Sequence, residues 1–382
     1  MRVLHVISTL NIGSGIANAV LNYYRKIDRN NLQFDFLVFS EPEKTFTKEV
    51  FDMGGRVFEI AAPTLKTSLQ YSNKIKKFFQ EHTNEWAWVH IHEILVQKYI
   101  IKAARIVGNI KIAMHSHASQ FVLPNSNVGF VQNKINMLIK RIRNAYLLSG
   151  FKNKTDLFLA CSYEAGVALY GKKGVKDQRF HILDNAIDVS KYLSNEEIRN
   201  KLREELQITT EKVLVNVGRL SEEKNQLFLI DVFLQVIKKD DSYRLFLVGK
   251  GSLEAKIRQR VEEYRLIDKV LFLGNRTDIA NVLMAADVFV FPSIVEGLGI
   301  ALVEAQASGL HCISSSTIPS CAIVTPYVKV VDLHAGVEIW AREILSSSLI
   351  RNNGNEIVAN SAFNIEKNID VLMNLYNGEK TE

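Results

Sequence analysis

The stretch VFVFPSIVEGLGIALVEA, residues 288–305, indicates the fold class. Its first four residues are apolar and favour a β-strand, and the proline and glycines that follow are typical of a loop. Residues 299–307 then have the apolar pattern of a buried helix. The same order of strand, loop and helix recurs on both sides of this stretch. Such an alternation predicts a doubly wound parallel sheet and therefore an α/β protein.

The alternation of strands and helices runs along the chain twice. The first series begins with a strand at residues 2–8, and the second begins at residues 212–217. We therefore predict two Rossmann-like domains, residues 1–188 and 189–361, that face each other across a cleft. The last amphipathic pattern, within residues 362–382, predicts an isolated helix that can pack on either domain, including back on the first.

Composition excludes several classes of protein. The chain has 382 residues, of which 47% are hydrophobic, so it can form real cores in about two or three domains. No apolar run approaches the length of about 18 residues that a membrane-spanning helix needs. Cys161, Cys312 and Cys321 lack the spacing of a zinc site or a disulfide scaffold. We therefore expect a cytoplasmic protein.

Basic side chains are concentrated in the first half of the chain. Residues 1–188 contain 25 Lys and Arg but 15 Asp and Glu, and residues 94–155 contain ten bases and no acid. Four of these bases lie in an amphipathic helical pattern at residues 128–150: Lys134, Lys140, Arg141 and Arg143. One interpretation is an ordinary helix with a solvated basic face. Because a base near an anionic leaflet is worth about 1 kcal/mol, the acid-free context favours peripheral docking on an anionic membrane surface. Nearby aromatic residues are not spaced for base stacking, so we expect no nucleic-acid partner.

Two carboxylates flank the glycines of the first stretch. Glu296 follows the predicted strand, and Glu304 lies about one turn into the helix that starts near Gly299. The start of a helix directs N–H groups and a positive dipole at an anion, and a carboxylate accepts hydrogen bonds from a sugar diol. The alternative is a solvated loop acid and a helix acid stabilised by the dipole. The adjacent glycines, which let a backbone approach a ligand, favour a binding site.

Two cations are expected at the same edge of the second domain. Arg219 and Lys224 lie in the segment VGRLSEEKN, residues 217–225, between the first strand of this domain and its first helix. Cations there can clamp a diphosphate and neutralise the charge that develops as it leaves. An Arg and a Lys in a polar turn are often only solvated. Together with Glu296 and Glu304, they predict a diphosphate clamp.

These motifs resemble those of the retaining GT-B glycosyltransferases of family four. The matching segments are VGR-xxxxK at residues 217–224, Glu-x7-Glu at residues 296–304, and Asn185-Ala-Ile-Asp188, where the family usually has Asn-Gly-Ile-Asp. His115-Ser-His117 is similar to the branch that builds bacterial capsules and exopolysaccharides. The resemblance covers nearly the whole chain and implies a GT-B fold.

The resemblance also implies a role for each matching residue. Arg219 and Lys224 would hold the donor diphosphate, Glu304 the ribose hydroxyls, and Glu296 the transferred sugar. His117, and less favourably His115, corresponds to a family histidine near the reacting centre of the sugar. The implied catalytic residues are therefore Arg219, Lys224, Glu296 and His117. Further donor contacts would come from a glycine turn near the phosphates, the loop after Glu296 and a cradle for the nucleobase: Gly13, Gly15, Gly297, Leu298, Gly299, Ile300, Asn275 and Arg276.

The function implied by the resemblance is that of a retaining hexosyltransferase that needs no metal and no cofactor. It would move a hexose from a nucleotide diphosphate sugar, which we expect to be UDP-linked, to a polyprenyl-diphosphate-linked glycan in capsular or exopolysaccharide synthesis. The reaction would take place at the inner face of the plasma membrane, with the acceptor held by the first domain. Two alternatives are a non-catalytic partner that binds a nucleotide sugar for another transferase, and a nucleotide-sugar epimerase of GT-B shape.

Overall fold

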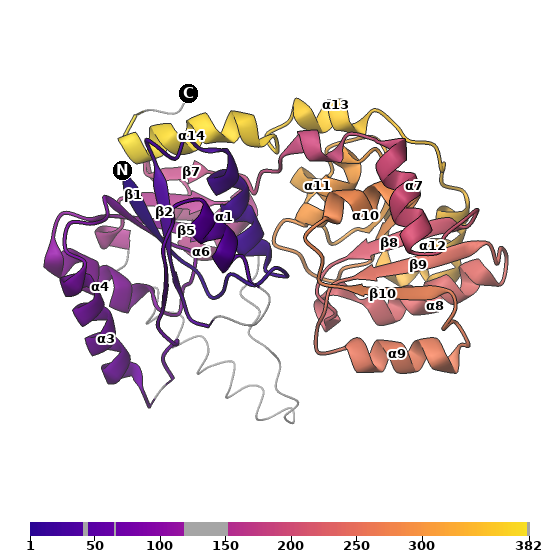
Figure 1. Cartoon of the computed structure of the whole chain (residues 1–382), viewed down its shortest axis with the longest axis horizontal. Coiled ribbons are helices and arrows are strands. Elements are labelled where there is room, and N and C mark those ends of the chain that lie inside the picture. The colour runs from indigo at the N-terminus through magenta and orange to yellow at the C-terminus, as the bar shows by residue number, and fades with distance from the viewer. Residues whose placement is uncertain (41–44, 65, 118–151, 380–382) are drawn as a thin grey trace. The chain divides into compact units, whose positions relative to one another are not determined.

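The computed structural model describes residues 1–40, 45–64, 66–117 and 152–379. The chain forms two compact units: unit 1 comprises Met1–Leu183 and Leu372–Glu382, and unit 2 comprises Asp184–Val371. Each unit is built on one parallel sheet. In Figure 1, the strands of unit 1 run from indigo to magenta, and those of unit 2 follow in the later colours of the bar.

Unit 1 contains a seven-stranded sheet in the order β3-β2-β1-β4-β5-β6-β7. All of its strand pairs are parallel. The strands are β1 (Arg2–Val6), β2 (Gln33–Val38), β3 (Val57–Glu59), β4 (Trp88–Ile91), β5 (Lys111–Ser116), β6 (Leu157–Ala160) and β7 (Phe180–Ile182). The described helices are α1 (Gly15–Lys26), α2 (Thr47–Asp52), α3 (Ser68–Glu81), α4 (Gln97–Val107), the 3-10 helix η1 (Lys152–Lys154) and α6 (Tyr163–Gly174).

The two faces of this sheet carry different side chains, because residues two apart on a strand share a face. On one face, Leu4 of β1 and Val89 of β4 belong to an apolar core that includes residues of α3 and α4. On the other face, the indole N–H of Trp88 donates to the carbonyl of Tyr376 at 2.9 Å. Tyr376 lies near the end of α14 (Ile365–Asn377), the yellow helix at the end of the chain in Figure 1. The last turns of α14 therefore pack on unit 1.

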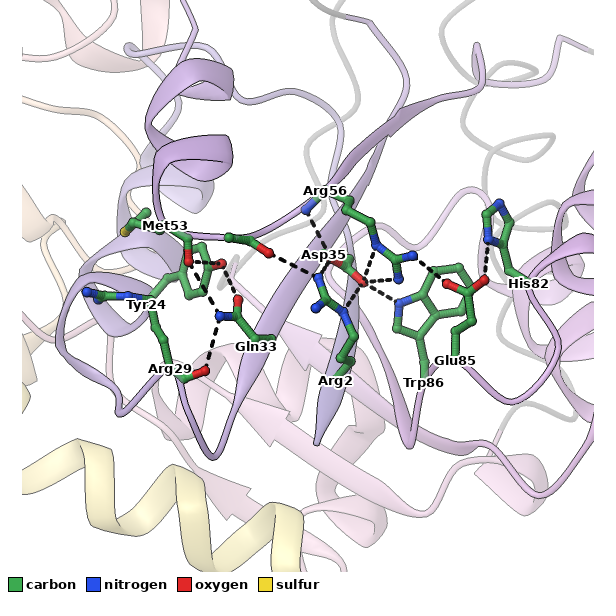
Figure 2. A network of polar contacts seen from close by, with 11 residues as sticks. Arg2, Tyr24, Arg29, Gln33, Asp35, Met53, Arg56, His82, Glu85 and Trp86 are labelled. Atoms are coloured by element: carbon green, nitrogen blue, oxygen red, sulfur yellow. Dashed lines mark hydrogen bonds and ion pairs between the residues drawn. The ribbon is translucent and has the colours of Figure 1, made fainter.

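A network of charged side chains joins the amino ends of four strands in unit 1 (Figure 2). Asp35 of β2 is fully buried and accepts hydrogen bonds from Arg2 Nε at 3.0 Å, Arg56 at 2.7 Å and the Trp86 indole at 2.7 Å. Burial alone would raise the pKa of Asp35, but these hydrogen bonds outweigh it and lower the pKa to about 2. Because ligands of parallel sheets bind at the carboxyl ends of strands, this network has a structural role.

Unit 2 contains a six-stranded sheet in the order β10-β9-β8-β11-β12-β13, and all of its strand pairs are parallel. The strands are β8 (Lys212–Val217), β9 (Tyr243–Val248), β10 (Val270–Gly274), β11 (Val288–Phe291), β12 (His311–Ser315) and β13 (Val328–Val331). The α-helices are α7 (Glu196–Glu205), α8 (Gln226–Ile237), α9 (Glu254–Glu263), α10 (Ile279–Ala285), α11 (Ile300–Ala307), α12 (Val337–Leu345) and α13 (Gly354–Ala359). Short 3-10 helices are η2 (Val189–Tyr192), η3 (Glu222–Lys224), η4 (Ser320–Ala322) and η5 (Leu333–Ala335).

The order of strands in unit 2 reverses between β8 and β11, which are neighbours in the sheet. At such a switch point, the loops that follow the two strands diverge and leave room for a ligand. The sequence predicted both strands with the bounds that they have here, and the loops after them contain the predicted clamp and the predicted carboxylate. The prediction of an α/β protein with two doubly wound parallel sheets is confirmed.

The segment that we predicted to face a membrane lies outside the described residues. It comprises residues 128–150, with Lys134, Lys140, Arg141 and Arg143. In the part of the chain that the structure does describe, no helix combines the length and the apolar character needed to cross a bilayer. Peripheral membrane docking therefore stays a prediction.

Candidate functional site

The turn between β8 and α8 is held in place by close contacts with the loop after β9. A side chain at Gly249 would place its Cβ 2.1 Å from the carbonyl oxygen of Gly218, and one at Gly251 would lie equally close to that of Leu220. Neither glycine can therefore be replaced without moving the backbone. Gln226 fixes the same turn from the helix side, because its Nε2 donates to the carbonyl of Arg219 at 3.0 Å. The two predicted clamp residues thus lie on a well-supported turn.

Lys224 and Glu296 are in direct contact. The ammonium of Lys224 donates to Oε1 of Glu296 in a short ion pair, and the two side chains are 21% and 8% exposed. The same ammonium lies 5.2 Å from the centre of the Phe291 ring, at the end of β11. The structure thus brings together the predicted cation and the predicted carboxylate at the carboxyl ends of β8 and β11.

Backbone hydrogen bonds fix the distance between the two loops that carry this pair. The N–H of Ile294 donates to the carbonyl of Glu223 at 2.7 Å. Nδ2 of Asn225 donates to the carbonyl of Pro292 at 3.2 Å. Asn225 adopts a left-handed conformation, with φ of 58°, which asparagine tolerates better than most residues. The ion pair is therefore positioned by the backbone and does not depend on side-chain packing alone.

The two arginines predicted to bind the donor have different surroundings. Arg219 is exposed, and its guanidinium forms no hydrogen bond or ion pair with another described residue. Arg276, after β10, donates two hydrogen bonds to Asp278, at 2.5 and 2.8 Å. This pairing raises the pKa of Arg276 and lowers the pKa of Asp278. Arg219 is thus available to an anion, whereas Arg276 is already paired with Asp278. The nucleobase role of Asn275 and Arg276 stays a prediction.

Glu304 lies on the helix that begins at the loop carrying Glu296. Gly299 precedes α11 with φ of 87°, a conformation that favours glycine, and no side chain caps this helix. Oε1 of Glu304 accepts a hydrogen bond from the hydroxyl of Tyr192 at 2.8 Å. Burial raises the pKa of Glu304 to about 7, against the opposing effect of Tyr192. Its carboxyl group can therefore change its charge near neutral pH.

The glycine turn of unit 1 lies after β1, as the sequence predicts. Ser14 is the N-cap of α1, and its hydroxyl accepts from the N–H of Ala17 at 3.3 Å. The N–H of Gly13 donates to Oδ1 of Asn11 at 2.8 Å. Apart from its own helix and chain neighbours, a Cβ placed on Gly15 would meet no atom of the described residues within 4 Å. The turn therefore leaves open space beside α1 that a ligand could occupy, although its donor role stays untested.

Unit 1 also holds a histidine cluster that the sequence analysis found only in part. His115 and His117, at the end of β5, lie together with His5 of β1 and with His90 and His92 at the end of β4. Alternation along the strands places all five on the face opposite the apolar core of α3 and α4. The sequence does contain a signal for this cluster, because the His-x-His pattern occurs twice, at residues 90–92 and 115–117, on strands that are neighbours in the sheet. His5 has no such signal.

The chain is similar to known glycosyltransferases along its whole length. Residues 198–345 match the family described as glycosyl transferases group 1. EpsF of Bacillus subtilis (strain 168) is 30% identical over 98% of this chain and 96% of its own length. The chain belongs to the glycosyl transferases group 1 family.

The chain also resembles a second relative in sequence and a solved structure in fold. The UDP-Gal:alpha-D-GlcNAc-diphosphoundecaprenol alpha-1,3-galactosyltransferase of Escherichia coli is 28% identical over 53% of this chain and 55% of its own. HepE of Anabaena, solved in complex with UDP and glucose, aligns with a TM-score of 0.78 at 16% identity, over 99% of both chains. This likeness shows the fold, which is GT-B as the sequence predicts. The family is a glycosyltransferase family, so the expectation of a transferase is confirmed at that level.

Proposed function

We propose that this group 1 protein is a retaining hexosyltransferase of capsule or exopolysaccharide synthesis. It would take a hexose from a UDP-linked donor and add it to a polyprenyl-diphosphate-linked glycan. The observation that carries the proposal is the contact between Lys224 and Glu296 at the switch point of unit 2. Two comparisons support the substrates: the Escherichia coli relative is named for a UDP-Gal donor and a diphosphoundecaprenol acceptor, and HepE was solved with UDP.

Lys224 and Arg219 would stabilise the diphosphate as it leaves. Lys224 is largely shielded from solvent, so its charge acts on a bound phosphate through a lower effective dielectric than that of water. Arg219 is exposed on the same turn and can turn toward the second phosphate. Because the turn is already held by Gln226 and the loop after β9, these charges need little rearrangement when the reaction occurs. The two side chains would supply the positive charge that a metal supplies elsewhere.

Glu296 and Glu304 would hold the sugar and the ribose. Glu296 is fixed by Lys224 and would accept hydrogen bonds from hydroxyls of the hexose. Glu304 lies about one turn into α11, and its ionised carboxylate would accept hydrogen bonds from the ribose diol. The backbone between them, Gly297 to Ile300, would contact the sugar and the phosphates. Asn275 and Arg276 would lie beside the nucleobase.

Retention of anomeric configuration would follow from attack on the face from which the diphosphate departs. The bond between the anomeric carbon and the phosphate oxygen breaks as the acceptor oxygen bonds to the same carbon. The departing phosphate oxygen takes the proton of the acceptor hydroxyl, so no protein nucleophile is needed. In unit 1, Gly13 and Gly15 would keep the donor role and His117 the catalytic role that the resemblance implies, and this unit would bind the acceptor at the membrane.

The first test is ligand-induced stabilisation by UDP, GDP, ADP and their common sugars. A ligand at one hundred times its dissociation constant stabilises the folded chain by about 2.7 kcal/mol. We expect a shift with UDP and one UDP-sugar, and a loss of that shift in Glu304→Ala. No shift with any nucleotide, with or without acceptor lipid, would contradict the proposed donor and favour a non-catalytic partner.

The second test is transfer to a polyprenyl-diphosphate sugar in detergent, with and without EDTA. Lys224→Ala and Arg219→Ala should each lower kcat/KM about 100- to 1,000-fold, which corresponds to about 2.7–4 kcal/mol. Lys256→Ala, an exposed residue of α9, is the matched control. Near-normal turnover in both clamp variants, dependence on an added metal, or a product of inverted configuration would each contradict the proposed mechanism.

A further inference from the structure

Five of the seven histidines of unit 1, His5, His90, His92, His115 and His117, form two rows of hydrogen-bonded rings. In the first row, Nδ1 of His5 lies 3.0 Å from Nε2 of His92, and Nδ1 of His92 lies 2.7 Å from Nε2 of His117. In the second row, Nε2 of His90 lies 3.2 Å from Nδ1 of His115. The rows stack on each other, with ring centroids 4.3 Å apart for His90 and His92 and 4.0 Å apart for His115 and His117.

The enclosed rings of this cluster are uncharged at neutral pH. Burial lowers the pKa of His5 to about 3, against a weaker opposing effect of Asp35. Burial and repulsion between charged rings hold the pKa of three more well below the usual value: His90, His92 and His115. A neutral imidazole keeps one nitrogen lone pair, which is the form that binds a metal. The cluster therefore presents several lone pairs in a small volume.

We propose that His92, His115 and His117 form a binding site for one transition-metal ion, which we take to be Zn²⁺. One ring nitrogen from each lies within 4.8 Å of the other two. Three neutral imidazoles plus a water molecule form a ligand set typical of tetrahedral zinc. His5, His90 and His92 form a second such group, but all three are buried. The group that includes His117 is the better candidate, because this residue is partly exposed at the carboxyl end of β5.

Hydrogen bonds around these ligands can select the tautomers that a metal requires. A ligating histidine usually donates its other ring N–H to an acceptor. For His92, Nε2–H can donate to Nδ1 of His5, which leaves Nδ1 of His92 for the metal. For His115, Nδ1–H can donate to Nε2 of His90. This leaves Nε2 of His115, a buried atom that forms no hydrogen bond of normal geometry with the described residues. The backbone carbonyl of Leu183 is close enough to raise the pKa of this ring slightly against the effect of burial.

A second-layer contact extends this arrangement to α14. Nδ1 of His90 lies 2.6 Å from the hydroxyl of Tyr376, so the tyrosine orients the ring that accepts from His115. Outer contacts of this kind hold ligating rings in place and raise their basicity. The site would thus be built from three strands and one helix of unit 1.

The rings must move to admit the ion, because the three nitrogens lie within 4.8 Å of one another and not yet at the spacing of zinc ligands. Two nitrogens bound to tetrahedral Zn²⁺ lie about 3.3 Å apart, given zinc–nitrogen bonds of about 2.0–2.1 Å. Nδ1 of His92 and Nε2 of His117 are 2.7 Å apart, so these rings must separate by about 0.6 Å. The proton that the two nitrogens share moves to the other nitrogen of His117.

The experiment is a zinc titration of the purified full-length chain without a histidine tag, after removal of metals with a chelator. Calorimetry and competition with a zinc indicator should give one equivalent of bound Zn²⁺. Co²⁺ in its place should give the visible absorption of a tetrahedral site. His117→Gln should weaken binding at least about 10-fold, and His92→Gln should do the same. His334→Gln, in the exposed segment η5, is the control and should bind as the unmodified chain does.

Folding of each variant is checked by its melting curve in the absence of metal. His117→Gln is the decisive variant, because this residue lies at the edge of the cluster and its loss leaves the inner rings packed. Binding that is absent in the unmodified chain, or equal in His117→Gln and His334→Gln, would overturn the proposal. Metal binding by itself is measured, so the result does not depend on the proposed transfer reaction. A His117 ring that holds zinc cannot contact the hexose in the same molecule, so the two roles belong to different states of the protein.

Discussion

Replacing Glu304 with glutamine should stabilise the ligand-free protein in alkaline solution. The pKa of Glu304 is raised from 4.5 to about 7 by burial. Below its unfolded pKa, the carboxyl group is protonated in both states and costs no stability. As the pH rises through the folded pKa, the unfolded chain ionises more readily than the folded one, so the free energy of unfolding falls. A shift of about 2.5 pH units corresponds to about 3 kcal/mol at 1.36 kcal/mol per unit. Glutamine keeps an acceptor for Tyr192 and removes this penalty.

The assay is urea unfolding of the unmodified chain and of Glu304→Gln at pH 5 and pH 8. The stability gained by the variant should be larger at pH 8 than at pH 5 by about 2–3 kcal/mol. Glu262→Gln is the matched control, because Glu262 is exposed on α9 and its replacement should have the same small effect at both pH values. A gain in Glu304→Gln that does not change with pH would refute the effect that we assign to burial.

The same residue links pH to the proposed donor. If the ionised form of Glu304 accepts hydrogen bonds from the ribose, UDP affinity should rise as the pH increases from 5 to 7. Binding supplies partners to a carboxylate that is otherwise poorly solvated. The rise should be smaller in Glu304→Gln, in which only the terminal phosphate of UDP still titrates in this range, and calorimetry at both pH values measures it. An equal pH dependence in the variant would place the titrating group elsewhere.

Three further predictions concern stability. Asp35→Asn should cost about 3–5 kcal/mol in urea unfolding at pH 7, because it breaks a buried ion pair. The stability that Asp35 contributes is present above its unfolded pKa and is lost as the pH falls toward 2. Equal stability of both chains at pH 7 would contradict this prediction. Gly299→Ala should cost about 1–2 kcal/mol in the same assay, because Gly299 has a positive φ. Gly15→Ala should cost less, because the space around Gly15 is open. The reverse order of the two losses would contradict the backbone geometry at the start of α11. Tyr376→Phe should cost about 1–3 kcal/mol by leaving a ring nitrogen of His90 unpaired, and an unchanged melting temperature would argue against that hydrogen bond.

The fold could be predicted from the sequence because each strand and helix is indicated by the residues within it and directly beside it. Strands at residues 212–217 and 288–291 are short apolar runs bounded by polar or glycine-containing turns, and the structure has the same bounds. The contact between Lys224 and Glu296 follows from topology, since residues after neighbouring parallel strands meet at one edge. Local pattern and a general rule of α/β sheets were enough for this part of the site.

Other contacts depend on residues that only the folded chain brings together. Tyr192 is 112 residues from Glu304, and no pattern around it indicates that it would contact a carboxylate on α11. His5 stands alone in an apolar strand, and its place in the histidine cluster depends on β1 lying beside β4. The pairing of Arg276 with Asp278 is local, but only the conformation of the loop shows that these two side chains bond to each other.

The packing of α14 against β4 determines the order in which the units can be completed during synthesis. All of unit 2 precedes residue 372, whereas unit 1 needs the segment from Leu372 onward. Unit 1 therefore cannot cover Trp88 and His90 until Tyr376 has been synthesised, and by then every residue of unit 2 has been synthesised as well. The half of the protein that is made first depends for its completion on a segment made after the other half.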